Sequence, residues 1–234
     1  MTSPCLLALD TATETCSVAL LKDGAVLVRS ELVGQRHSER ALPMVDGLLR
    51  DTGTTLGELD LIAFGAGPGS FTGLRIACGL AQGLAWAARK PVIAVGNLMA
   101  LAARAFAQAD DCRSVLCAID ARMHEAYCAV YQRGPEIHEV LAPRLARPAD
   151  LAVLARDVDA VVGEALTAFA AELAGLPHRT LLPELRADAG DIARLAGTES
   201  MRARAVAPHE ARPIYVRDQV AMTTEERRVR ATPT

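Results

Sequence analysis

Apolar side chains recur along this chain in two patterns, which predict alternating strands and helices. Apolar runs of strand length occupy positions 4–9, 16–21, 25–29, 61–64 and 91–95. Lys22-Asp23-Gly24, between two of these runs, predicts a tight hairpin. Residues 37–40 open a predicted helix with Ser38 as its expected N-cap, and one apolar face of it is formed by Leu42, Val45, Leu48 and Leu49. Further helices are predicted at 74–88 and 98–108. This alternation predicts an α/β fold with mixed sheets.

The second half of the chain repeats the pattern of the first. Residues 5–10, Cys-Leu-Leu-Ala-Leu-Asp, match residues 115–120, Val-Leu-Cys-Ala-Ile-Asp, and a further strand begins seven residues after each final aspartate. The offset predicts two copies of one strand–hairpin–helix unit, in domains of residues 1–109 and 110–234. Elements predicted later in the second copy are a helix from Pro148, a strand at 159–162, and helices near 167–174 and 191–196.

Composition narrows the class of protein. The chain has 234 residues, 51% of them hydrophobic, which predicts a well-filled core. Its formal net charge of −3 argues against free-standing nucleic-acid binding, because clustered basic charge supplies most of that affinity. The 6 cysteines form no C-x-x-C pair and are expected to be free thiols. With no leader and no membrane-length apolar run, we expect a cytoplasmic protein with no membrane partner.

A glycine-rich loop at residues 65–73, Gly-Ala-Gly-Pro-Gly-Ser-Phe-Thr-Gly, joins a predicted strand to a predicted helix. Backbone N–H groups and the positive end of a helix dipole make such a loop a possible anion site. The lysine of a phosphate-binding Walker loop is missing, and so is the G-x-G-x-x-G spacing of dinucleotide sites. The alternative is a tight turn that packs the helix closely against the strand.

Polar residues after the first strand extend this candidate site. In a phosphate-handling enzyme, Asp10 would hold a metal ion while the Thr11 and Thr13 hydroxyls bind phosphate oxygens, although the same residues also build ordinary turns. The candidate phosphate or nucleotide site, functional or vestigial, comprises Asp10, Thr11, Thr13, Gly67, Gly69, Ser70 and Asp120. No catalytic residue is predicted: the sequence has no G-x-S-x-G elbow and no H-x-x-x-H metal face.

Four stretches of the chain resemble the TsaB (YeaZ) family. They are residues 6–13 (Leu-Leu-Ala-Leu-Asp-Thr-Ala-Thr), 36–44 (Arg-His-Ser-Glu-Arg-Ala-Leu-Pro-Met), 65–76 (Gly-Ala-Gly-Pro-Gly-Ser-Phe-Thr-Gly-Leu-Arg-Ile) and 213–218 (Pro-Ile-Tyr-Val-Arg-Asp). The resemblance implies two actin-like (ASKHA, ribonuclease H-like) domains, each a mixed sheet flanked by helices. It also implies a non-catalytic subunit of the machinery for N6-threonylcarbamoylation of adenosine 37 in tRNAs that read ANN codons.

The related transferase TsaD holds its metal on a His-x-x-x-His helix. The corresponding positions here are Asn97 and Leu101, and leucine cannot be a ligand. The resemblance therefore predicts no metal and no cofactor on this chain, with ATP and metal on partner subunits.

The resemblance further implies that the chain binds and stabilises TsaD through a helical bundle. On the same resemblance we expect it to assemble with the ATPase TsaE and to reach tRNA only through the complex; a homodimer through the same surface is possible when the chain is alone. The implied interface residues are His37, Leu42, Val45, Leu49, Ala77, Leu80, Ala81 and Leu84. Ordinary core packing of these helices is the alternative.

Two questions stay open at this point. The chain could instead be a stand-alone enzyme of the same fold, either a small-molecule kinase using Asp10, Thr11, Thr13 and Asp120, or a peptidase. The arginine-rich C-terminal tail, with three arginines in residues 227–230, could contact tRNA or TsaE.

Overall fold

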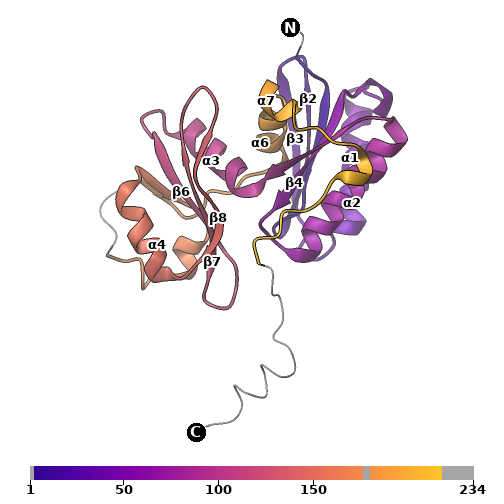
Figure 1. The fold of residues 1–234 in the computed structure, drawn as a ribbon. Helices are drawn as coiled ribbons and strands as arrows, with labels where there is room; N and C mark the ends of the chain where they lie inside the picture. The colour runs from indigo at the N-terminus through magenta and orange to yellow at the C-terminus, as the bar shows by residue number, and fades with distance from the viewer. Residues whose placement is uncertain (1–2, 176–179, 218–234) are drawn as a thin grey trace.

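The structure is a computed structural model, and it describes residues 3–175 and 180–217. Two five-stranded mixed sheets lie side by side (Figure 1). The first has the order β3-β2-β1-β4-β5, with β1 (Leu6–Asp10), β2 (Thr15–Lys22), β3 (Ala25–Leu32), β4 (Leu61–Gly67) and β5 (Val92–Gly96). The second has the order β10-β9-β6-β7-β8, with β6 (Ser114–Asp120), β7 (Ala126–Gln132), β8 (His138–Ala146), β9 (Ala160–Val162) and β10 (Thr180–Leu182).

The predicted internal duplication is confirmed by the sheet topology. In each sheet an antiparallel meander of three strands is extended on one side by two parallel strands. The strands that end on Asp10 and Asp120, β1 and β6, occupy the same central place in their sheets. We call each sheet with the helices that cover it a lobe.

Local sequence explains the central strands and the first hairpin. Every residue of β1 and β4 is buried, as expected for strands covered on both faces of a sheet. Asp23 and Gly24 have φ of 52° and 78°, the left-handed pair that a two-residue hairpin requires. The predicted Asp-Gly turn is confirmed.

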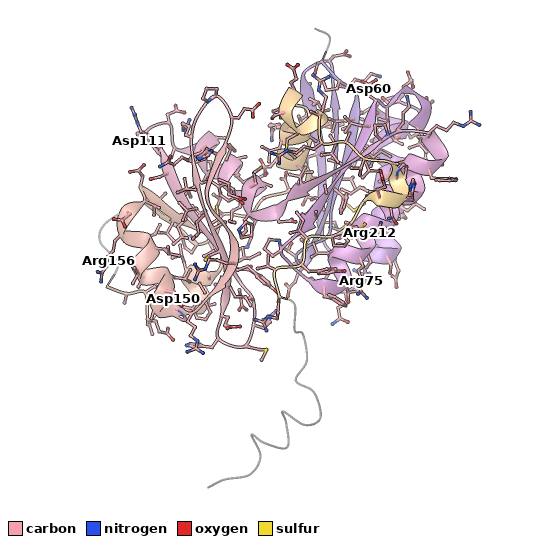
Figure 2. All side chains as sticks on the ribbon, viewed as in Figure 1. Asp60, Arg75, Asp111, Asp150, Arg156 and Arg212 are labelled. Atoms are coloured by element: carbon pink, nitrogen blue, oxygen red, sulfur yellow. The ribbon has the colours of Figure 1, made fainter. Side chains whose placement is uncertain are left out.

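Helices cover both faces of the first sheet. On one face, α1 (His37–Asp51) and α2 (Phe71–Ala88) enclose a core with Leu9, Val18 and Phe64. The opposite face is covered by α6 (Ala189–Ala196) and α7 (Glu199–Arg202). Side chains fill the space between helices and sheet (Figure 2). The second lobe contains α3 (Asn97–Gln108), α4 (Pro148–Leu154) and α5 (Ala165–Ala168). Elsewhere along the chain there are short 3-10 helices at η1 (Leu56–Glu58), η2 (Ala155–Asp157) and η3 (Pro208–Glu210).

The structure corrects several element boundaries. Ser38 is not the N-cap of α1, because the helix already begins at His37 and Ser38 lies in its first turn. Helix α2 begins at Phe71 rather than 74, because the Ser70 hydroxyl caps it by accepting the Gly73 N–H. Helix α5 ends at Ala168, well short of 174. Strand β8 was not predicted, since alternate outward side chains and an internal proline weaken its apolar pattern.

The C-terminal part of the described chain returns to the first lobe. Helices α6 and α7 pack there, and Val206 forms a β-bridge with Val92 of β5. The strands therefore divide near residue 109, whereas the last helices lie with the first sheet; the predicted domain boundary at 109/110 stays a prediction. Within the described ranges no helix is long and apolar enough to cross a membrane. The arginines of 227–230 lie outside the described residues.

Candidate functional site

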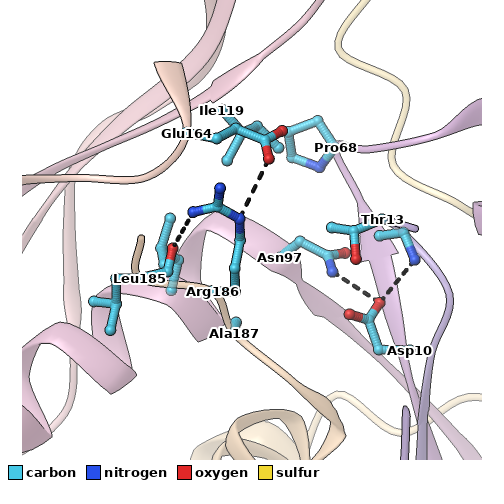
Figure 3. A pocket seen from close by; sticks show the side chains of 11 residues that line it. Asp10, Thr13, Pro68, Asn97, Ile119, Glu164, Leu185, Arg186 and Ala187 are labelled. Atoms are coloured by element: carbon cyan, nitrogen blue, oxygen red, sulfur yellow. Dashed lines mark hydrogen bonds and ion pairs between the residues drawn. The ribbon is translucent and has the colours of Figure 1, made fainter. Parts of the chain in front are cut away.

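A small cleft lies between the two lobes (Figure 3). Its cavity volume is about 30 Å³, which is room for one or two water molecules. Its lining residues come from both sheets and from the chain segment that leads into α6: Asp10, Ala12, Thr13, Pro68, Asn97, Leu101, Ile119, Glu164, Leu185, Arg186 and Ala187. A drug-sized or nucleotide-sized ligand needs several hundred Å³, so the cleft as it stands does not enclose one.

Asp10 is the buried acid of this cleft. Its Oδ1 accepts hydrogen bonds from Asn97 Nδ2 at 3.0 Å and from the Ala12 N–H at 3.2 Å. The Asn97 oxygen accepts the Gly67 N–H at 2.7 Å, which fixes the orientation of the amide. Burial raises the pKa of Asp10 to about 6, against the opposing effect of those hydrogen bonds. A side chain at Gly65 would collide with this arrangement, since its Cβ would lie 2.3 Å from Asp10 Oδ1.

The glycine loop packs against the turn that follows β1. A Cβ at Gly73 would lie 1.9 Å from the Thr11 carbonyl oxygen, and one at Gly69 would lie 2.8 Å from Ala12. In return, the Thr11 hydroxyl donates to the Gly73 carbonyl at 2.7 Å, and the Ser70 N–H donates to the Ala12 carbonyl at 2.8 Å. The loop N–H groups of Gly67, Ser70 and Gly73 thus have partners inside the protein. This geometry favours the tight-turn interpretation over a phosphate cradle.

The predicted phosphate or nucleotide residues do not form one group. Asp10 and Thr13 line the cleft, while Thr11, Gly67, Gly69 and Ser70 belong to the packing between loop and turn. Asp120 accepts the Arg122 N–H at 2.8 Å and forms an ion pair with the Arg122 guanidinium at 3.3 Å. It is not among the lining residues of the cleft.

Two features of the cleft were missed from the sequence. Asn97 was considered only as a non-ligand, yet it bonds both Asp10 and Gly67. Across the cleft, Arg186 Nε lies 3.3 Å from Glu164 Oε2, an ion pair that joins the segment before α6 to the second lobe (Figure 3). Both partners lie in irregular segments, where no periodicity signals that they will meet.

The described residues contain no group of three or more His, Cys, Asp or Glu side chains suited to holding a metal ion. The cleft can hold water or a small polar molecule against a carboxyl group that titrates near pH 6.

The predicted interface residues occupy different depths on α1 and α2. His37, Val45, Ala77 and Ala81 are buried in the core of the first lobe. Leu49, Leu80 and Leu84 are partly buried against that core, and Leu42 is 49% exposed. Core packing therefore accounts for the buried four, while Leu42 and the three partly buried leucines reach the surface. That this surface is an interface stays a prediction.

The outward face of α2 carries a pattern that the sequence prediction did not include. Positions 71, 75, 79, 83 and 86 are all exposed, and Trp86 is 71% exposed. Among the described residues, a Cβ added at Gly79 or at Gly83 would meet no atom within 4 Å. Nothing in the described chain occupies the space above these two glycines, and Leu80 and Leu84 flank them.

Comparison with known proteins gives concordant results. The family profile of tRNA N6-adenosine threonylcarbamoyltransferase, TsaD, matches residues 28–224. The tRNA threonylcarbamoyladenosine biosynthesis protein TsaB of Escherichia coli K12 is 40% identical over 226 residues, which cover 92% of this chain and 96% of that protein.

Two solved structures from Pseudomonas aeruginosa are similar as well. One is YeaZ, with 40% identity, a TM-score of 0.80, and coverage of 91% of this chain and 99% of that one. The other is described as an uncharacterized protein with similarity to peptidase YeaZ, with 40% identity and a TM-score of 0.84 over 92% of this chain and 100% of that one.

Proposed function

Because the chain belongs to the TsaB (YeaZ) family of tRNA threonylcarbamoyladenosine biosynthesis proteins, we propose that it is a non-catalytic subunit that binds and stabilises the transferase TsaD. Its two mixed sheets flanked by helices are the actin-like fold of that family. In this proposal the complex modifies adenosine 37 in tRNAs that read ANN codons.

The observation that carries the proposal is the outward face of α2. Glycine inside a helix costs about 0.5–1 kcal/mol relative to alanine. Gly79 and Gly83 have no positive φ, and no neighbour in the part of the chain that the structure describes is close enough to require glycine there. A second helix could lie across these positions in the space that the absent side chains leave open. Small residues let two helix backbones approach closely. Leu80, Leu84 and Trp86 would then supply apolar contact around the crossing point.

If this chain is a non-catalytic subunit, its partners must supply the catalytic groups. We place ATP and metal on TsaD and TsaE, with tRNA reached only through the complex. The net charge of −3 supports the last point, since the free chain has little electrostatic attraction for a polyanion. A second copy of this chain could occupy the same face when TsaD is absent.

Gel filtration of the purified chain mixed with TsaD tests the proposal. We expect one co-eluting complex, which Gly83→Leu abolishes because the new side chain fills the space that the partner needs. Val140→Glu is the matched control: Val140 is 51% exposed on β8 of the other lobe, so this variant should still bind. Independent elution of both wild-type proteins would overturn the proposal.

A kinase is the second candidate, and the buried carboxyl group of Asp10 beside the cleft is the observation that favours it. Calorimetry with Mg-ATP separates the two functions. Saturable binding at micromolar nucleotide that is lost in Asp10→Ala would support a kinase, whereas no heat at millimolar nucleotide would exclude it. The peptidase alternative has no such observation in its favour.

A further inference from the structure

The last described residues cross from one lobe to the other. We call residues 211–217 the C-terminal strap; in Figure 1 it is the yellow segment that descends between the lobes to the end of the described chain. On the first lobe, the Ala211 carbonyl accepts from Gln82 Nε2 at 3.1 Å, and the Ile214 N–H donates to the Ala66 carbonyl at 2.7 Å. The strap is thus anchored to α2 and to the end of β4.

An aromatic contact strengthens this anchor. The rings of Tyr215 and Phe71 lie 5.6 Å apart, and the Arg75 guanidinium lies 3.8 Å from the Phe71 ring centre. Arg75 Nε also donates to the Tyr215 hydroxyl at 3.0 Å. Tyr215 therefore joins the strap to the N-terminal part of α2 through a ring contact with Phe71 and a hydrogen bond from Arg75.

On the second lobe, the strap ends at Arg217. Its Nη2 donates to Glu125 Oε2 at 2.7 Å and to the Ala121 carbonyl at 3.3 Å, and its Nη1 donates to Met123 Sδ at 2.9 Å. The side chain is only 13% exposed, so the charge-assisted bond to Glu125 is shielded from solvent.

The segment that Arg217 holds is strained. We call residues 121–125, between β6 and β7, the left-handed turn, because Arg122, Met123 and His124 have φ of 63°, 57° and 60°. Three successive non-glycine residues in this region are unfavourable, and they persist only where the surroundings hold them. Arg217 contacts the first, middle and last residues of the turn.

The closed arrangement is also incompletely satisfied. Arg217 Nε is buried and finds no hydrogen-bond partner within the described part of the chain. A buried donor without a partner is costly, so the closed state lies closer in free energy to an open one. The contact between Arg217 and the left-handed turn is therefore able to open. The strap is anchored at its other end, the turn is strained, and one buried donor is unsatisfied.

We propose that the C-terminal strap is a latch: Arg217 and the left-handed turn close and open as one unit, and opening releases one of the contacts that join the two lobes. The cleft beside Asp10 holds only about 30 Å³ while the lobes are tied. Opening the latch removes one of the contacts that must break before the lobes can separate; the Asn97 bonds to Asp10 and to Gly67 are others. This device belongs to the free chain and does not depend on the proposed partner.

Amide hydrogen exchange, resolved by residue with NMR, tests the latch in the full-length chain. The reporting amides are Ile214, bonded to Ala66, and Ala121 and Glu125, bonded within the turn. Arg217→Gln should speed exchange at all three by a common factor of at least about tenfold, since they share one opening event. The amide of Ala8 in the buried β1 should not change, which excludes global unfolding.

Matched variants complete the test. Glu125→Gln should give the same three changes, and the double variant should add little to either single one. Arg122→Gln is the control, because this 84% exposed side chain pairs with Asp120 rather than with the strap. The proposal would be overturned if, in the Arg217 and Glu125 variants, exchange became faster only at Ile214 or only at the two turn amides. It would also be overturned if none of the three amides exchanged faster. If Arg217→Gln does not fold, Glu125→Gln decides by the same amides.

Discussion

Asp10 ends β1 with its carboxyl group buried beside the Asn97 amide, and this environment makes its ionisation costly. The folded-state pKa is about 6, above the ordinary value of 3.8. Protonated Asp10 therefore adds stability below pH 4, and this contribution is lost as the pH rises through 6. At neutral pH the carboxylate form therefore destabilises the fold.

Asp10→Asn removes that penalty while keeping an oxygen that can accept from Ala12 and Asn97. At pH 8 we expect the free energy of unfolding of the variant to be about 2–3 kcal/mol higher than that of the wild type. The gain should shrink between pH 6 and pH 4. Urea unfolding across this pH range measures it, and a gain independent of pH would show that Asp10 is not the titrating group.

Individual residues were predictable where each follows a predicted strand. Asp10 comes after the strand predicted at 4–9 and the glycine loop after the one at 61–64, and both were predicted to belong to one candidate site although they are far apart in the chain. Asn97 and the Arg186–Glu164 pair join segments whose meeting depends on how the lobes are packed. No spacing in the sequence encodes such contacts.

At the scale of elements, α2 carries glycines with opposite roles. Gly73 is held against the Thr11 carbonyl, whereas Gly79 and Gly83 face open space. Gly83→Ala and Gly79→Ala should each raise the free energy of unfolding by about 0.5–1 kcal/mol, through helix propensity alone.

Gly73→Ala provides the contrast within the same helix. Its Cβ would overlap a backbone oxygen, so we expect a loss of about 3 kcal/mol. Thermal unfolding of the three variants measures both effects. Destabilisation by Gly83→Ala would mean that this glycine is needed inside the chain, and the argument for an external partner would fail.

Elements with a strong pattern were predicted well. Strands β1, β2, β4 and β6 and helices α1, α2 and α3 appear within a few residues of their expected positions. Strand β8 and the short α5 were missed or misplaced, because a half-exposed strand and a single helical turn leave little periodicity. The N-cap of α1 was wrong because Ser38 is equally suited to the first turn of a helix.

For the whole molecule, the repeated aspartate-ended strand was enough to predict two copies of one strand–hairpin–helix unit, whereas the order of the strands within each sheet was not predicted. The return of α6 and α7 to the first lobe was not predictable, since their apolar faces fit either sheet. The strap and the left-handed turn were also missed, because positive φ at Arg122, Met123 and His124 has no sequence signal.

The reactivity of the cysteine thiols tests the packing of both lobes in one experiment. Of the 6 cysteines, Cys5 is partly exposed, and the other five are buried. Burial raises the pKa of Cys16 and of Cys128 to about 11, so little reactive thiolate forms there. A disulfide-exchange reagent at pH 8 should therefore titrate Cys5 first, and the others only on unfolding. Rapid reaction of several thiols in the native protein would contradict the packing described for the two lobes.

The outward face of α2 is where we propose that TsaD binds. The most direct measurement is calorimetric titration of TsaD with the wild-type chain and with Gly83→Ala. We predict that the variant, although more stable, binds at least about tenfold more weakly, because even one methyl group obstructs a close helix crossing. Equal affinity of the two proteins for TsaD would contradict the account.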